Sequence, residues 1–227
     1  MRSSRRPSPE VAGEEALTRH TDYGGERLEE GDLAPTPHEQ FARWLDEAAR
    51  RGVYEPNAMV LGTIGADGVP QSRTVLCRGV DERGFVFYTD RSSRKGRALS
   101  AHPVATLLFP WYALHRQVIV TGVVDLVDDA ESDAYWDSRP HGSRIAATAS
   151  RQSQPVDGRD ALEARVRAEA ERYPAEIPVP RPERWGGYRV APTRVEFWQG
   201  RTSRLHDRLV FSRPAVTDPW RVERLQP

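Results

Sequence analysis

Short runs of alternating apolar and polar residues, several of them separated by tight turns, recur along the chain from residue 58 onward. Five runs lie in the first half, at residues 58–64, 71–78, 85–89, 104–109 and 117–127, and four lie near the end, at 188–191, 194–198, 208–211 and 221–225. Alternation of this kind, rich in β-branched and aromatic residues, predicts β-strands. Turns at 66–68 and 81–84 join the first three runs, which is typical of an antiparallel meander. The core is therefore expected to be mainly β.

Helical spacing occurs in a few segments between these strands. From Pro37 to near Gly52, apolar residues recur every three or four positions, which predicts one amphipathic helix. Three further segments have helical character: 94–101, which follows the capping residues Ser92 and Ser93, then 129–138 and 159–173. Antiparallel strands with inserted helices favour a mainly β, α+β fold. We expect a closed or partly closed barrel rather than a doubly wound sheet.

The first 37 residues differ in composition from the rest of the chain. They are rich in Arg, Glu, Gly and Pro and lack apolar periodicity. A segment of this composition buries too little apolar surface to fold by itself. We therefore expect a mobile N-terminal arm over residues 1–37 and one folded domain over residues 38–227, a length that a single β-barrel commonly has.

Charge and cysteine content narrow the classes of function. The 33 basic and 33 acidic residues cancel, so no overall positive field attracts nucleic acid or an anionic membrane. The longest nearly apolar stretch, 104–114, is far shorter than the roughly 20 residues of a membrane-spanning helix, and no signal-peptide core follows the N-terminal arginines. The lone Cys77 excludes an internal disulfide and fits a reducing cytoplasm, and no metal-ligand constellation is apparent. A soluble cytoplasmic protein with local anion sites is expected.

One group of candidate residues has the composition of a phosphate site. It combines strand residues with the start of a predicted helix: Arg73, Arg78, Ser92, Ser93, Arg94 and Lys95. Hydroxyls, cations and helix N–H groups together bind phosphate, although a solvated turn with scattered arginines has the same composition. Arg73 and Arg78 are five positions apart, so on a regular strand they point to opposite faces. Without a bulge they cannot hold one phosphate together, which leaves two phosphates or one functional arginine.

A second group surrounds the end of the helix predicted over 129–138. It consists of Tyr135, Arg139, Pro140 and Ser143, with the aromatic residue one turn before the arginine. Taken alone, the group is equally typical of a helix C-cap with an exposed arginine.

A third group follows Trp198-Gln199-Gly200. If residues 204–208 are extended, Arg204, His206 and Arg208 share one face of the strand while Leu205 points away. Cationic and polar side chains on one face beside a tryptophan suit a planar anionic ligand. The alternative is a structural histidine that is hydrogen-bonded to Asp207 or to another acid.

The order and spacing of many short motifs resemble the pyridoxamine 5'-phosphate oxidase family from about Phe41 to Pro227. These motifs include Asn57-Ala58-Met59-Val60-Leu61, Arg73-Thr74-Val75-Leu76, Phe87-Tyr88-Thr89, Ser93-Arg94-Lys95-Gly96, Phe109-Pro110-Trp111, Arg116-Gln117-Val118, Ser138-Arg139-Pro140, Gln152-Ser153, Trp185-Gly186-Gly187-Tyr188, Glu196-Phe197-Trp198-Gln199-Gly200 and Arg204-Leu205-His206-Asp207-Arg208. The resemblance implies a split β-barrel homodimer with FMN bound at the subunit interface.

The resemblance also implies an activity. It predicts that pyridoxamine or pyridoxine 5'-phosphate is oxidised to pyridoxal 5'-phosphate, with dioxygen as electron acceptor and hydrogen peroxide as product. Two alternatives share the barrel: an FMN oxidase of the phenazine-biosynthesis type, and a non-catalytic module that binds flavin or pyridoxal phosphate. In the first alternative the substrate is a tricyclic carboxylate, whereas Tyr135, Arg139 and Ser143 favour a phosphorylated one.

Residue roles follow from the same resemblance. The implied FMN-binding residues are Arg73, Thr74, Val75, Leu76, Cys77, Arg78, Tyr88, Thr89, Arg94, Lys95, Gln117, Gln152, Ser153, Trp198 and Arg208. The implied substrate-binding residues are Arg78, Tyr135, Arg139, Ser143, Arg204, Leu205 and His206, of which Arg204 and His206 contact the pyridine ring and the reacting C4' substituent as catalytic residues. Arg73 and Arg78 would thus serve different ligands. The chain departs from the family at Arg78, usually Lys, and at Ala146 and Thr148, usually Gly and Trp.

Overall fold

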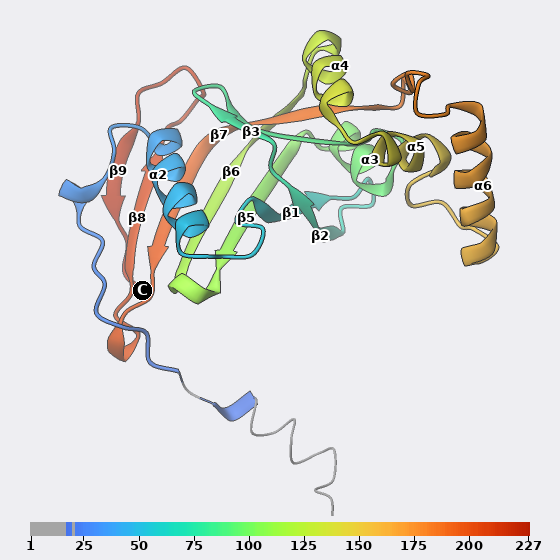
Figure 1. Ribbon diagram of the computed structural model, residues 1–227. Helices are drawn as coiled ribbons and strands as arrows, with labels where there is room; N and C mark the ends of the chain where they lie inside the picture. Colours follow the sequence, from blue (N-terminus) through green and yellow to red (C-terminus); the bar gives the residue numbers. More distant parts are fainter. Residues whose placement is uncertain (1–16, 20) are drawn as a thin grey trace, which may run out of the picture.

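Nine strands form one curled antiparallel sheet in the computed structural model, which describes residues 17–19 and 21–227. They are β1 (Ala58–Ile64), β2 (Pro70–Leu76), β3 (Gly79–Asp81), β4 (Gly84–Asp90), β5 (Val104–Trp111), β6 (Arg116–Leu126), β7 (Trp185–Gln199), β8 (Asp207–Ser212) and β9 (Arg221–Arg224). The order is β2-β1-β5-β6-β7-β4-β3, and β8 pairs with both β7 and β9. Figure 1 shows how the sheet curls around one side of the molecule. The expectation of a mainly β barrel is confirmed.

The long strand β7 determines the shape of the sheet. Along one edge, β7 pairs with β6 over nearly its full length. Along the other edge, the first part of β7 pairs with β4 and its last part pairs with β8. The register with β6 shifts between Thr121 and Gly122, and a bulge of this kind increases the local twist. The two strands predicted at 188–191 and 194–198 are therefore one strand that serves two parts of the barrel.

Five α-helices of the described chain lie beside the sheet: α2 (Pro37–Arg50), α3 (Arg94–Ala101), α4 (Asp129–Ser138), α5 (His141–Ala149) and α6 (Arg159–Arg172). The helix α2 begins with a capping box, in which Thr36 accepts from the Glu39 N–H and the Glu39 carboxylate accepts from the Thr36 N–H. Sequence patterns predict α2, α3, α4 and α6 but not α5, and they miss the short strand β3.

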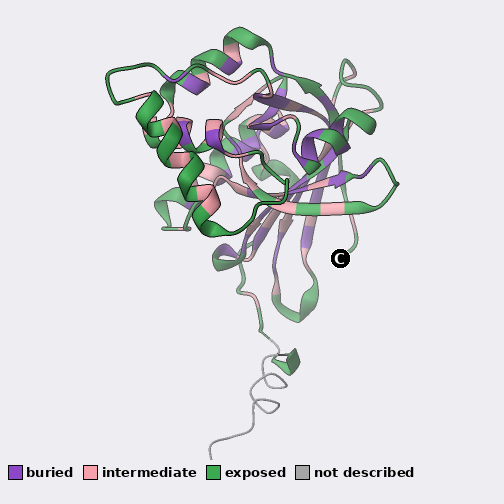
Figure 2. Ribbon diagram, turned by 90° about the vertical axis from the view of Figure 1, so that its right-hand side faces the viewer, coloured by how far each residue is buried: buried purple, intermediate pink, exposed green. Residues whose placement is uncertain are grey.

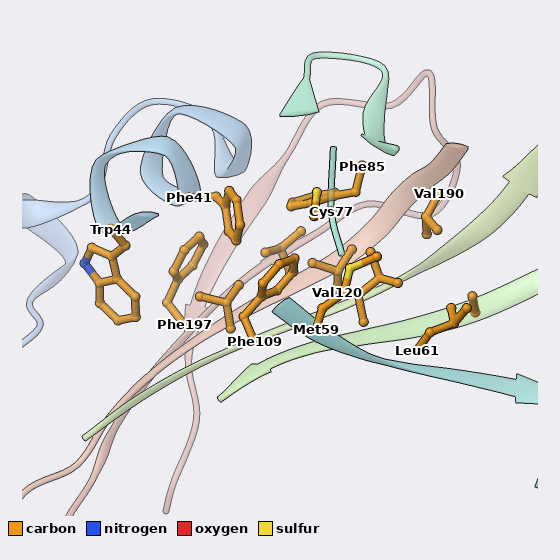
Figure 3. Packing of buried hydrophobic residues seen from close by; sticks show 14 of the residues in the cluster. Phe41, Trp44, Met59, Leu61, Cys77, Phe85, Phe109, Val120, Val190 and Phe197 are labelled. Atoms are coloured by element: carbon orange, nitrogen blue, oxygen red, sulfur yellow. The ribbon is translucent and has the colours of Figure 1, made fainter. Parts of the chain in front are cut away.

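The main core lies between α2 and the inner face of the sheet (Figures 2 and 3). Phe41 of α2 contacts Phe85 and Phe109 with ring centroids 4.9 and 4.6 Å apart. All three rings are at most 1% exposed. A second, smaller cluster contains Trp136, Ile145, Val179 and Trp185 and joins α4 and α5 to the start of β7. Trp185 of this second cluster also lines the candidate site.

The segment predicted as a mobile arm is divided in the structure. Its residues 1–16 and 20 lie outside the described residues. Farther along, Leu28 and Ala34 are buried, and the short 3-10 helix η1 (Glu30–Asp32) lies beside β9. Arg224 of β9 donates to the Leu28 carbonyl and to the carboxylates of Glu29 and Glu30. In the part of the chain that the structure describes, no helix is long and apolar enough to cross a membrane.

Candidate active site

A large cavity of about 1330 Å³ lies between β2, the start of α3 and the junction of α4 with α5. The first residue of β7, Trp185, also lines it. Of the residues predicted to bind FMN or substrate, the cavity is lined by Arg73, Thr74, Val75, Leu76, Arg78, Tyr88, Thr89, Arg94, Lys95, Tyr135, Arg139, Ser143, Gln152 and Ser153. The volume exceeds the ~300 to 1,000 Å³ typical of a site for one small ligand.

One end of the cavity carries the cations of Arg73, Arg94 and Lys95. The Lys95 side chain is nearly buried, and its ammonium donates to Gln152 Oε1 at 2.6 Å and to Thr89 Oγ1 at 3.2 Å. Burial, and then the charge of Arg73, lower the pKa of Lys95 to about 8. Burial and the charge of Arg94 also lower the pKa of Arg73, whose guanidinium donates to neutral oxygens on Leu61, Thr63 and Gln71. This concentration of cations suits an anionic ligand.

Tertiary contacts bring Gln152 and Ser153 to the same end. Ser93 caps α3, and the N–H of Arg94 donates to Ser153 Oγ at 3.1 Å. Ser153 has a positive φ of 70°, which turns the loop after α5 toward α3. Thr89 of β4 donates its hydroxyl to Gln152 Oε1 at 3.0 Å. Strand, helix and loop thus present hydroxyl and amide groups beside the cations.

The other end of the cavity carries Arg78, Tyr135, Arg139 and Ser143. The Arg139 guanidinium lies over the rings of Trp136 and Trp185, at 5.0 and 4.7 Å from their centroids. Its Nη1 is buried without a hydrogen-bond partner among the described residues. Burial lowers the pKa of Arg139, and the charges of Arg78 and Arg144 lower it further. Ser143 lies in the first turn of α5, a position at which helices favour anions.

Arg73 and Arg78 line one cavity, so the expectation that they point to opposite faces of a strand is wrong. The strand β2 ends at Leu76, and the Arg78 N–H donates to the Val86 carbonyl instead of continuing the pairing with β1. Cys77 is buried at this turn, where its thiol donates to the Gly79 carbonyl, and it does not line the cavity. Burial raises the pKa of the Cys77 thiol to about 11. The two arginines belong to different cationic groups of one cavity, because Arg73 interacts with Arg94 and Lys95 whereas Arg78 interacts with Arg139.

The remaining predicted residues do not line this cavity. Gln117 of β6, Trp198 of β7 and Arg208 of β8 form a row of cross-strand neighbours. Trp198 follows Trp185 by 13 residues in the same strand, which is about 40 Å at the usual rise per residue. Figure 1 shows the two ends of β7 on opposite sides of the molecule. Arg208 is paired with Glu196 through two hydrogen bonds of 2.7 and 3.0 Å.

Arg204, Leu205 and His206 lie beside this row, but not in the conformation expected from the sequence. Residues 204–208 are not one extended segment, because the 3-10 helix η3 (Thr202–Arg204) precedes them and β8 begins only at Asp207. Ser203 and Arg204 have positive φ angles of 55° and 60°. The expectation that Arg204 and His206 share one face of a strand is therefore wrong. Leu205 is 70% exposed, in agreement with its pointing away.

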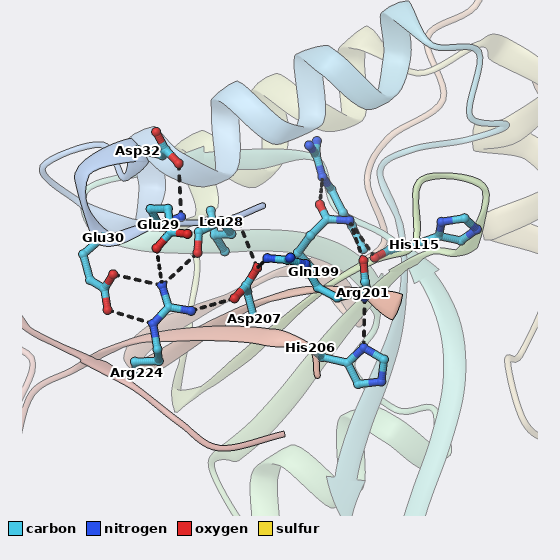
Figure 4. A network of polar contacts seen from close by, with 12 residues as sticks. Leu28, Glu29, Glu30, Asp32, His115, Gln199, Arg201, His206, Asp207 and Arg224 are labelled. Atoms are coloured by element: carbon cyan, nitrogen blue, oxygen red, sulfur yellow. Dashed lines mark hydrogen bonds and ion pairs between the residues drawn. The ribbon is translucent and has the colours of Figure 1, made fainter. Parts of the chain in front are cut away.

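His206 is held by the backbone and by aromatic rings rather than by an acid. Its Nδ1 accepts from the Arg201 N–H at 3.1 Å (Figure 4), and its ring lies 4.6 Å from that of Trp198 and 5.6 Å from that of Tyr23. Burial and the charge of Arg204 lower the pKa of His206. Asp207 instead accepts from the Leu28 N–H and from Arg201 and Arg224 (Figure 4). The alternative of a structural histidine that is hydrogen-bonded to Asp207 is thus not found among the described residues.

Three residues near these groups, His115, Trp185 and Tyr23, have no role predicted from the sequence. His115, at a positive φ of 52°, packs against Tyr23 at 4.9 Å. Trp185 lines the cavity and stacks with Tyr88 and Tyr135. Tyr23 lies in a segment without periodicity, so only the tertiary structure brings it to His206 and Trp198.

Comparisons with known proteins agree with this geometry. Residues 45–173 match the family described as pyridoxamine 5'-phosphate oxidase, and residues 185–227 match the pyridoxine 5'-phosphate oxidase C-terminal dimerisation region. A pyridoxine/pyridoxamine 5'-phosphate oxidase from Burkholderia ambifaria is 55% identical over 91% of this chain and 96% of its own. Another, from Rubrobacter xylanophilus, is 52% identical over 96% of this chain and 100% of its own.

Solved structures show the same fold. PhzG from Burkholderia lata 383, in complex with tetrahydrophenazine-1-carboxylic acid, has a TM-score of 0.84 at 32% identity and covers 91% of this chain and 100% of its own. A pyridoxamine 5'-phosphate oxidase-related, FMN-binding protein from Nostoc punctiforme has a TM-score of 0.68 at 20% identity and covers 86% and 100%. The matched families and the identity to the curated relatives establish that this chain, with its FMN-binding split-barrel fold, belongs to the pyridoxamine 5'-phosphate oxidase family.

Proposed function

We propose that this protein is an FMN-dependent oxidase that converts pyridoxamine or pyridoxine 5'-phosphate to pyridoxal 5'-phosphate. The observation that carries the proposal is one cavity with two separate cationic ends, Arg73 with Arg94 and Lys95, and Arg78 with Arg139. Such a site suits two phosphorylated ligands at once, a cofactor and a substrate. The names of the curated relatives support the same reading.

The residues at the first end fit FMN. Arg73, Arg94 and Lys95 would hold its phosphate, beside Tyr88, Thr89, Gln152, Ser153 and the stretch from Thr74 to Leu76. The buried ammonium of Lys95 and the helix start at Ser93 are donors of the kind that a phosphate requires. When bound, FMN would supply the hydride acceptor, and dioxygen would return it to the oxidised state with release of hydrogen peroxide.

The residues at the second end would bind the substrate phosphate. Arg78 and Arg139 supply charge, and Ser143 supplies a hydroxyl at the start of α5. Tyr135, stacked with Tyr88 at 4.0 Å, lines the wall between the two ends. Anchoring of the remote phosphate would restrict the motion of the pyridine ring and bring C4' into reacting geometry.

A second subunit is needed to complete this site. Arg204 and His206, together with Gln117, Trp198 and Arg208, lie near the other end of β7, too far to meet the same ligands within one chain. The match of residues 185–227 to a dimerisation region supports a homodimer. We propose that each subunit contributes this group to the partner's cavity, where Arg204 and His206 orient the substrate ring. Neither residue has to act as a nucleophile.

A second candidate is an oxidase that acts on a phenazine precursor. It is favoured by the TM-score of 0.84 to PhzG, which was solved with tetrahydrophenazine-1-carboxylic acid. The three cavity residues Tyr135, Arg139 and Ser143, beside a helix N-terminus, favour the phosphorylated substrate instead.

Purified protein tests both candidates. We expect a yellow dimer that releases hydrogen peroxide with pyridoxamine or pyridoxine 5'-phosphate and not with tetrahydrophenazine-1-carboxylic acid. Peroxide from the tricyclic acid alone would support the second candidate. A yellow protein without turnover on any of the three would support a binding module. A colourless monomer that takes up no added FMN would refute the proposal.

A further inference from the structure

Arg139 is held mainly by aromatic rings. Its guanidinium lies 4.7 Å from the centroid of Trp185 and 5.0 Å from that of Trp136. Its Nη1 is buried and has no hydrogen-bond partner in the part of the chain that the structure describes. A cation in contact with ring faces keeps part of the electrostatic stabilisation that it loses on leaving water. Arg139 also lines the cavity, so the rings hold its guanidinium at the cavity wall.

Trp185 is fixed on several sides. Its ring is nearly parallel to those of Tyr88 and Tyr135, at 5.6 and 6.0 Å with angles of 10° and 7°, and Trp136 meets it edge to face at 4.7 Å. The Trp185 carbonyl accepts from Arg181 Nη1 at 2.7 Å. The residue is 6% exposed and begins β7. It therefore presents a rigid surface to the guanidinium.

Arg139 requires such support because it is buried and close to other cations. Burial disfavours the charged form of Arg139 most, and the charges of Arg78 and Arg144 disfavour it further. Arg144 is close to the Asp137 carboxylate, at 3.9 Å, whereas none of the ion pairs found among the described residues involves Arg139. Without the rings, a flexible arginine in this position would be free to turn away from the other two cations.

We propose that Trp185 is a positioning residue for the phosphorylated substrate. It holds the Arg139 guanidinium extended along the cavity wall, so that the phosphate meets a donor already in place. Preorganisation of this kind increases affinity because less conformational freedom is lost on binding. The inference rests on the proposed function, since it assumes that Arg139 contacts the substrate phosphate.

A double-mutant cycle tests the proposal. The variants are Trp185→Leu, Arg139→Ala and their combination, each loaded with FMN, and the measurements are KM, kcat and the dissociation constant of added pyridoxal 5'-phosphate. We expect Trp185→Leu to raise KM and the dissociation constant by about three- to thirtyfold, the range of a partly desolvated cation–π contact, with a smaller change in kcat. In the Arg139→Ala background the same substitution should change neither constant.

Two controls separate positioning from damage to the fold. Trp220→Leu removes a tryptophan that lies under Arg213 at 4.1 Å, away from both site groups, and should leave KM unchanged. Trp185→Phe keeps a smaller ring face and should raise KM less than Trp185→Leu does. If Trp185→Leu fails to fold, Trp185→Phe is measured with and without Arg139→Ala instead. The inference then requires that Trp185→Phe change KM and the dissociation constant only when Arg139 is present.

The results that overturn the inference differ from those that overturn the proposed function. If the Trp185 substitution raised KM and the dissociation constant equally with and without Arg139, Trp185 would not act by positioning Arg139. An equal rise in KM for pyridoxine, which lacks the phosphate, would refute the inference as well. Failure of the unmodified protein to oxidise either phosphorylated vitamer would refute the proposed function. In that case the dissociation constants for pyridoxal 5'-phosphate would still show whether the effect of the Trp185 substitution depends on Arg139.

Discussion

The affinity of this protein for FMN should fall as pH rises from 7 to 9, because Lys95 loses its proton in the empty site. The Lys95 ammonium is buried beside Arg73, and its hydrogen bonds go to the neutral oxygens of Thr89, Ser93 and Gln152. Burial and the Arg73 charge lower its pKa to about 8. Lys95 of the empty site is therefore half protonated near pH 8, mostly charged at pH 7 and mostly neutral at pH 9.

The size of the effect follows from proton linkage. A bound phosphate dianion favours the ammonium, so the pKa of Lys95 should rise toward its ordinary value of about 10.4 in the complex. The phosphate itself is a dianion throughout, since its second pKa is near 6. Between pH 8 and the higher value, binding takes up one proton. The dissociation constant should then rise by about tenfold between pH 7 and pH 9, or about 1.4 kcal/mol.

Titration of the FMN-free protein by quenching of flavin fluorescence at pH 7, 8 and 9 measures this slope. Lys95→Arg is the matched control, because a guanidinium stays charged over the whole range and should flatten the curve. Lys95→Met should also flatten it, with weaker binding at pH 7. A constant affinity for the unmodified protein, or an equal slope in Lys95→Arg, would show that Lys95 does not titrate in the empty site.

Four further outcomes follow from the site. Arg78→Ala should raise the substrate KM by about ten- to a hundredfold, because one charge-assisted hydrogen bond is lost, and should leave the FMN affinity unchanged. Arg78→Lys should retain most of the activity. Steady-state kinetics and FMN titration measure both effects. Arg204→Ala or His206→Ala should lower turnover more than flavin content, and unchanged turnover in both would move the substrate site elsewhere. Deletion of residues 1–18, which lie mostly outside the described residues, should preserve the soluble dimer and its flavin content, and aggregation on gel filtration would contradict this. Co-refolding of the impaired Arg78→Ala and His206→Ala subunits in equal amounts should recover about a quarter of the normal activity at low substrate, because half the dimers then contain one intact site; no recovery would contradict sites shared between subunits.

Most strands could be predicted from the sequence because their signals are local. Asp-Gly-type turns and period-two alternation give the positions of β1, β2 and β4 to within a residue or two. The split of β7 into two predicted strands is explained by Pro192, which normally marks an edge or an end. Pro192 lies between the residues paired with β4, which end at Val190, and those paired with β8, which begin at Arg194. One edge of β7 is unpaired there, so a residue without an N–H is tolerated.

The helix α5 could not be predicted because its local signals are weak. Its N-cap, Pro140, offers no side-chain acceptor, and its sequence, His-Gly-Ser-Arg-Ile-Ala-Ala-Thr-Ala, contains glycine and threonine among small residues. Tertiary contacts support it instead. Arg184 donates to the carbonyls of Ala147, Thr148 and Ser150 at the end of this helix, and it also pairs with Asp90 of β4. Residues distant in sequence thus hold a helix that no local pattern indicates.

The candidate site shows the same limit. The composition typical of a phosphate site predicts Arg73, Arg94 and Lys95 as one group, although β3 and β4 separate them in the chain. It cannot join Gln152 and Ser153 to them, since that contact depends on a loop with a positive φ at Ser153 and on a hydrogen bond from the Arg94 N–H. The sequence likewise predicts an extended segment before β8, because it gives no sign of the backbone conformation that the tertiary structure imposes there. Two successive positive φ angles at ordinary residues, Ser203 and Arg204, have no sequence signature and persist only when the surroundings impose them.

The position of the two residue groups at opposite ends of β7 has a consequence for assembly. In a dimer with twofold symmetry, any contact from the Trp198 end of one subunit to the cavity of the other is repeated in reverse, so two equivalent sites form at once. The exposed Leu205 and the strained backbone at Ser203 and Arg204 lie at the end that would enter the partner's cavity. Hydrogen bonds from Leu28, Arg201 and Arg224 to Asp207 hold that loop to the barrel before any partner binds. These hydrogen bonds hold the loop to its own subunit in the conformation in which it would meet the partner.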